Sequence, residues 1–150
     1  MILETSKFGS IEYTESEIIT MSRGILGFES LKSFIIIGLV GQEPFKWLQS
    51  LEDPELAFLM IDPLFFKPDY IVDIHPDDLT VLNTSNINDI IVFVFVSIPK
   101  GNPSRMSANL QAPLVINTNN MSAAQLVLAE SVYNIEHSIF DEVEQRLASA

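Results

Sequence analysis

The feature that most constrains this fold is a succession of short apolar segments separated by turn residues. Isoleucine and valine number 28 against 8 alanines, and β-branched side chains favour strands whereas alanine favours helices. Proline, glycine and aspartate interrupt the apolar segments, most clearly at 53–54, 62–63, 68–69 and 100–103. The expected strands are Met1–Thr5, Ser10–Tyr13, Ile18–Met21, Phe34–Val40, Phe45–Ser50, Leu56–Ile61, Tyr70–Ile74, Ile90–Ile98, Pro113–Asn117 and Gln125–Ala129.

This spacing predicts an all-β fold, an antiparallel barrel-like or sandwich structure of about ten short strands. Parallel neighbours joined in sequence need crossovers of a dozen or more residues, and most gaps here are shorter. One short helix is expected after His75, because Pro76 suits a first helical turn and the acids that follow complement the helix dipole. A second helix is expected at about 140–148. No linker or repeat divides the chain, so residues 1–150 are expected to form a single domain.

Charge and composition exclude several classes of protein. The 20 acidic and 8 basic residues give a formal net charge of −12, which disfavours nucleic-acid phosphates and steers the chain toward a basic partner. An apolar content of 47% excludes general disorder. The longest apolar run, Ile90–Ile98, is too short for a membrane helix of about 20 residues. With no signal-peptide pattern at the N-terminus, a cytoplasmic location without membrane contact is expected.

Motifs for catalysis and cofactor binding are absent from the sequence. There is no nucleophile elbow, P-loop or dinucleotide fingerprint, and no cysteine that could serve as a nucleophile or zinc ligand. A cluster with metal-binding side chains is Asp73, His75, Asp77 and Asp78. A strand end followed by a helix start explains this cluster better. The chain is therefore expected to be no enzyme and to carry neither metal nor cofactor.

Two loops combine aromatic side chains, prolines and acids, which favours a surface for a protein partner. We predict an apolar groove formed by Phe45, Trp47, Phe65 and Phe66. An acidic rim is expected from Glu52, Asp53, Glu55 and Asp69. Gln49 and Tyr70 lie within the same loops and complete the predicted contact set. Such a groove could receive a helix or an extended tail.

Several short strings occur together in a characteristic order. They are Gly24–Glu29 (GILGFE), Trp47–Ser50 (WLQS), Asp53–Phe58 (DPELAF), Asp62-Pro63, Pro68–Tyr70 (PDY) and Ala108–Asn117 (ANLQAPLVIN). In this order and at this spacing the set closely resembles the FliW family of flagellar assembly factors. The similarity runs from Phe8 to Phe140, nearly the whole chain.

The resemblance implies a small, cytoplasmic, barrel-like protein that has no enzymatic activity and acts through protein partners. FliW proteins bind flagellin, and they bind CsrA, a dimeric RNA-binding repressor of translation. When flagellin is scarce, free FliW captures CsrA and releases flagellin messenger RNA for translation. When flagellin accumulates, it occupies FliW and repression returns. The resemblance thus implies flagellin and CsrA as partners, and we expect a monomer without direct nucleic-acid binding.

The family strings also mark residues that we expect to support the fold. They are Gly24, Gly27, Phe28, Asn109, Pro113 and Asn117. The glycines are expected in turns that need positive φ, and the asparagines are expected to hold backbone groups at strand ends. The stretch 118–124 departs from the family, because it lacks the lysine-rich turn often found there.

Two alternatives remain open from the sequence. One is a flagellin chaperone without a role in translation. The other is a β-barrel protein that binds a small ligand in a polar-dotted cavity, for which a pocket lined by His75 or His137 would be the sign.

Overall fold

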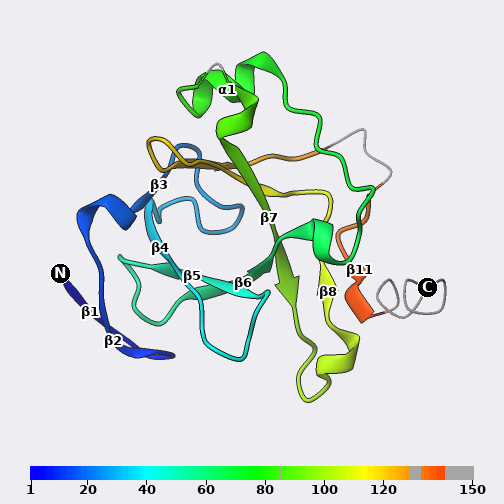
Figure 1. Cartoon of the computed structure of the whole chain (residues 1–150). Coiled ribbons are helices and arrows are strands. Elements are labelled where there is room, and N and C mark those ends of the chain that lie inside the picture. Colours follow the sequence, from blue (N-terminus) through cyan, green and yellow to red (C-terminus); the bar gives the residue numbers. More distant parts are fainter. Residues whose placement is uncertain (85, 129–132, 141–150) are drawn as a thin grey trace.

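The structure is a computed structural model of the chain, and it describes residues 1–84, 86–128 and 133–140 (Figure 1). These residues form mainly strands with little helix, and the connection between residues 61 and 90 carries three of the helical elements. The strands are β1 (Ile2–Thr5), β2 (Gly9–Glu12), β3 (Ile19–Met21), β4 (Ser33–Ile37), β5 (Lys46–Ser50), β6 (Ala57–Ile61), β7 (Ile90–Ser97), β8 (Ser107–Ala108), β9 (Leu114–Asn117), β10 (Ser122–Gln125) and β11 (His137–Ser138). The helical elements are α1 (Pro76–Val81) and four single 3₁₀ turns, η1 (Glu15–Glu17), η2 (Pro63–Phe65), η3 (Ile87–Asp89) and η4 (Pro103–Arg105).

Seven of the described strands close a barrel, which confirms the all-β prediction. The order is β7-β6-β5-β4-β3-β10-β9, and β9 pairs again with β7. β8 and β11 extend the sheet beyond β7, while β1 and β2 form a separate hairpin. β7 is the longest strand and crosses the centre of the view in Figure 1. Closure leaves most strands of the barrel with a neighbour on both sides, so few edges are open.

One strand pair differs from the antiparallel expectation. β3 and β10 are parallel, with Thr20 opposite Ser122 and Met21 opposite Ala123. The expectation was wrong here because it considered only strands that are close in sequence. These two strands are about a hundred residues apart, and most of the barrel itself forms the crossover between them.

Two strand predictions need correction, and two short strands were not predicted. The segment Tyr70–Ile74 pairs with no other strand of the described residues. The strand expected at Gln125–Ala129, whose last residue lies outside the described residues, begins earlier, as β10, because Ser122 pairs with Asn117 across a tight turn. The short strands β8 and β11 were not predicted, since two residues carry no recognisable alternation.

The helix expected after His75 is confirmed as α1. Its start is held by the Asp78 carboxylate, which accepts a hydrogen bond from the His75 N–H at 3.1 Å. The second predicted helix, 140–148, lies almost entirely outside the described residues. No helix among the described residues has the length and apolar character to cross a bilayer.

The core divides into three apolar clusters that follow from alternation along the strands. Phe34, Leu48 and Met60 are fully buried inside the barrel. Phe66 and Val94 belong to a second cluster beside β7, and a third cluster lies near α1. Burial of each such side chain stabilises the fold by about 1.5–3 kcal/mol.

The β1–β2 hairpin docks on the outer face of β5. The Phe8 ring meets the Trp47 ring edge to face, with centroids 5.6 Å apart. The Lys7 Nζ lies 4.6 Å from the Trp47 ring centroid, a cation–π distance. The Ser6 N–H donates to the Pro54 carbonyl at 3.2 Å. Trp47 therefore holds an otherwise isolated two-stranded sheet against the barrel.

Candidate partner-binding surface

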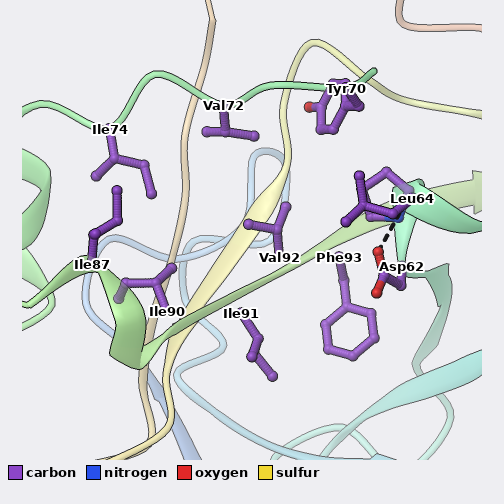
Figure 2. Close-up of a pocket in the computed structure, with 11 residues that line it drawn as sticks. Asp62, Leu64, Tyr70, Val72, Ile74, Ile87, Ile90, Ile91, Val92 and Phe93 are labelled. Carbon is purple, nitrogen blue, oxygen red and sulfur yellow. Dashed lines mark hydrogen bonds between the residues drawn. The ribbon is translucent and has the colours of Figure 1, made fainter. Parts of the chain in front are cut away.

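An open apolar groove of about 480 Å³ lies beside β7 (Figure 2). One wall is the start of β7 with η3 before it, and the opposite wall is the segment after Tyr70. The turn at 62–64 closes one end. Ile87, Ile91 and Leu64 line the groove and are 54%, 41% and 53% exposed. A contiguous apolar surface of this kind is a recognised sign of a binding site.

The groove exists because β6 is too short to reach the first residues of β7, the strand that it pairs with. β6 pairs with β7 only through Met60 and Ile61, which lie opposite Phe95 and Val94. The chain then turns away at Pro63, since the Asp62 carboxylate accepts a hydrogen bond from the Leu64 N–H at 2.9 Å and caps η2. The first half of β7 is thus left without a neighbour on its β6 side.

The opposite wall is an extended but unpaired chain. Along it exposure alternates, with Val72 and Ile74 facing inward and Ile71 and Asp73 facing solvent. Tyr70 anchors its start, because the buried hydroxyl donates to the Leu110 carbonyl at 2.6 Å. Burial raises the pKa of Tyr70 above its usual value, and the neighbouring Tyr133 raises it further. Tyr70 is therefore a structural support of the groove wall.

The charge around the groove is strongly acidic. Residues 62–93 contain six aspartates and one lysine, which is a formal net charge of −5. The single lysine, Lys67, lies 3.4 Å from a carboxylate oxygen of Asp69, whose side chain is 81% exposed. Asp78 pairs more weakly with Arg23 at 3.7 Å. The apolar groove consequently sits in a negative field that favours cationic groups on a partner.

The four predicted aromatic residues do not form one groove. Phe65 is 55% exposed at the rim of η2, but Phe66 is 0% exposed in the second core cluster. Phe45 packs against the same cluster, and Trp47 packs on Phe8. The groove prediction is therefore wrong for Phe66, which has no surface to offer. The error arose because the 3₁₀ turn η2 directs the side chains of Phe65 and Phe66 differently, one to solvent and one to the core. The sequence does not show which of two successive aromatic residues is buried.

The predicted acidic rim is also divided by the fold. Glu52, Asp53 and Glu55 lie in the turn before β6, whereas Asp69 follows its far end. The Glu52 carboxylate accepts hydrogen bonds from the backbone N–H groups of Lys32 and Ser33. The Asp53 carboxylate accepts one from the Glu55 N–H at 3.1 Å. Of the four acids, only Asp69 lies in the segment that borders the groove.

Gln49 is buried at 0% exposure and its assignment as a direct contact is corrected, whereas Tyr70, at 7% exposure, lines the groove. The Gln49 side-chain amide donates to the Ser50 carbonyl at 2.9 Å. Its Oε1 has no partner among the described residues. Gln49 therefore supports its loop from beneath the surface, while a direct contact through Tyr70 stays a prediction.

The residues that the sequence argument missed are Ile87, Ile90, Ile91 and Val92. The run Ile90–Ile98 was expected to be a strand and was assigned no part in partner binding. A signal was available, because this run is longer than the preceding one and the Asp62-Pro63 turn ends that shorter strand early. Recognising it required the register of the two strands, which only the structure supplies.

The residues of the family strings that were expected to support the fold mostly shape turns or bind backbone groups. Gly24 has φ +79° and Gly27 has φ +88°, and the Phe28 ring lies 5.2 Å from that of Phe58. The Asn109 side-chain oxygen accepts from the N–H groups of Gln111 and Ala112, both at 3.1 Å.

The second asparagine joins the barrel to α1. Asn117 is 1% exposed and donates through its amide to the Leu82 carbonyl at 2.8 Å. Its oxygen accepts from the Asn119 N–H at 3.0 Å. The Pro113 carbonyl, at the start of β9, accepts from the Leu126 N–H at 2.9 Å.

The acids and histidines do not assemble a metal site in the described residues, where no group of three or more is placed to hold an ion. Asp78 is engaged with Arg23 and with the His75 backbone. Neither His75 nor His137 lines the groove. A pocket lined by a histidine, which would have favoured a protein that binds a small ligand, is therefore not found at this groove.

Comparison with known proteins decides the family. Residues 2–139 match the family model described as FliW protein. The chain belongs to the FliW family. It is 41% identical to the flagellar assembly factor FliW of Caldanaerobacter subterraneus over the whole of both chains. It is 42% identical to the FliW of Alkaliphilus metalliredigens over 97% of this chain and 90% of the relative.

A solved structure supports the fold independently. The chain matches a crystal structure of the flagellar assembly factor FliW with a TM-score of 0.86 and 31% identity. The match covers 93% of this chain and 97% of the solved one. Of the FliW strings in the sequence, only the Asp62-Pro63 and Tyr70 strings contribute to the groove.

Proposed function

We propose that this chain is a non-enzymatic, cytoplasmic flagellar assembly factor that binds flagellin and antagonises the translational repressor CsrA. In this role it couples the level of free flagellin to flagellin translation. The observation that carries the proposal is the match to FliW across residues 2–139, together with relatives described as flagellar assembly factors along their full length. The chain is proposed to act as a single-domain monomer.

Two features of the molecule support a role in protein binding. The net charge of −12 complements a partner that itself binds RNA and is therefore basic. The groove beside β7 is apolar with acidic surroundings, and it offers the exposed Ile87, Ile91 and Leu64 to such a partner. Solvent-exposed apolar side chains within a charged surround are typical of transient interfaces.

The test is calorimetric titration of the full chain with flagellin and with CsrA from the same organism, first separately and then in competition. Binding of both, with flagellin displacing CsrA, is the expected result. Binding of flagellin alone would reduce the role to that of a chaperone. Binding of neither by the folded protein would contradict the proposal.

A further inference from the structure

The groove runs along the hydrogen-bonding edge of β7 and not over one face of the sheet. Successive side chains of a strand point to opposite faces, yet Ile90, Ile91, Val92 and Phe93 all line the groove. In Figure 2 the Val92 side chain points toward the wall formed by Val72, whereas Ile91 and Phe93 point the other way. A cavity that both faces line must lie at the strand's edge.

The register shows which backbone groups face this edge. The Thr118 N–H donates to the Asp89 carbonyl at 2.9 Å, and Ile90 lies opposite Asn117. Residue 89 therefore directs its backbone groups toward β9, and every second residue after it does the same. The backbone N–H and C=O of Val92 then point toward the groove. Val94, two residues on, pairs with Ile61 on this same side.

The edge is open over a length that suits a short peptide. No described strand pairs with residues 90–93 on the β6 side. At about 3.3 Å a residue, these four residues present about 13 Å of strand edge. The wall at 71–74 is extended too and keeps Val72 and Ile74 turned into the groove.

We infer that, within the proposed function, this groove takes an extended segment of CsrA, which adds a strand to the open edge of β7. Alternate apolar side chains of that segment pack against Val72, Ile74 and Ile91. The formal charge of −5 over residues 62–93 selects a segment flanked by lysine or arginine. Charge complementarity favours the basic RNA-binding partner as the occupant over flagellin.

Backbone pairing distinguishes this mode from a helix laid in the groove. In strand addition the main chain supplies hydrogen bonds and the pockets on alternate sides supply specificity. A helix satisfies its own backbone groups and would leave the Val92 N–H exposed to solvent. The Val92 amide is therefore the direct reporter of the occupant's conformation.

The first experiment measures the affinity of CsrA for the Ile91→Lys variant by calorimetry. Ile91 is 41% exposed, so the variant is expected to fold. A cation in the groove should repel a basic segment and lower affinity roughly tenfold or more. The matched control is Val40→Lys, which makes the same charge change at a residue 98% exposed outside the groove. Its affinity should stay within about twofold of the wild type, because an isolated surface charge contributes little.

The second experiment follows hydrogen exchange at the Val92 amide by NMR, with and without saturating CsrA. Slower exchange in the complex is expected, because the amide gains an acceptor. Lost affinity in Ile91→Lys together with unchanged exchange at Val92 would overturn strand addition. Equal affinities of Ile91→Lys and Val40→Lys, or an effect on flagellin alone, would overturn the assignment of this groove to CsrA. Absence of CsrA binding by the wild type would overturn the proposed function as well.

Discussion

At the scale of single residues, Gly24 shows how one side chain can be forbidden by its surroundings. A Cβ at this position would lie 2.8 Å from the Glu29 Cα, and the backbone has φ +79°. Gly24→Ala is expected to lower the free energy of unfolding by more than the about 1–2 kcal/mol that a positive φ alone would cause. Urea denaturation measures the change. Gly27→Ala is the matched control, since its φ is +88° with no atom within 4 Å, and equal losses in both variants would contradict the argument.

Tyr70 links a buried hydroxyl to pH-dependent stability. The pKa of Tyr70 is raised in the folded chain by burial and then by Tyr133. The neutral hydroxyl therefore stabilises the fold below the usual tyrosine pKa of about 10, and this contribution declines as pH rises above that value. The phenylalanine variant Tyr70→Phe also leaves the Leu110 carbonyl without its donor and should lose about 1–3 kcal/mol at neutral pH.

The measurement is urea denaturation of the wild type and Tyr70→Phe at pH 7 and at about pH 11. The difference in unfolding free energy between the two proteins should shrink at the higher pH, because only the wild type has a phenol to ionise. Taking this difference cancels the other groups that titrate in the same range. A gap that stays constant with pH would show that the Tyr70 pKa is not raised.

At the scale of elements, the β1–β2 hairpin is held on the barrel by the contacts of Phe8 and Lys7 with Trp47 and by the hydrogen bond from Ser6 to Pro54. A two-stranded hairpin is marginal alone in water, and this one rests on the Phe8–Trp47 pair. Phe8→Ala should speed amide exchange throughout β1 and β2 while the barrel strands keep their protection. Hydrogen-exchange NMR reads the two regions separately. Ile2→Ala, at a residue 65% exposed in the same hairpin, should leave both unchanged, and a uniform loss of protection in Phe8→Ala would contradict local docking.

The same scale explains which elements could be predicted from the sequence. β4, β6 and β7 were expected because each carries a run of apolar residues, and β5 was expected because its segment lies between turn residues. The segment Tyr70–Ile74 is likewise mostly apolar and follows a turn, yet it pairs with no described strand. Val72 and Ile74 face inward while Ile71 is exposed, and Tyr70 fastens the start of the segment to Leu110. Alternation thus predicts a half-buried extended chain, and pairing depends on whether a neighbouring edge is within reach.

At the scale of the whole molecule, the charge of −12 governs encounter with a basic partner. The association rate with the proposed partner CsrA should fall about tenfold or more as NaCl rises from about 0.05 M to 0.5 M, because salt screens the field that steers the approach. Stopped-flow mixing with fluorescently labelled CsrA measures this rate. The dissociation rate should change much less. A salt-independent association rate would mean that the acidity serves solubility alone.

The sequence by itself determined the strand content, the helix start at Pro76, the glycine turns and the family, because each depends on residues that are neighbours along the chain. Tertiary structure alone decided the parallel pairing of β3 with β10 and the open edge at residues 90–93. It also decided the burial of Phe66 and Gln49 and the separation of Glu52 from Asp69. These features depend on strand register and on barrel closure between residues far apart in sequence. Local propensity carries no information about such contacts, since it does not say which segment will lie beside which.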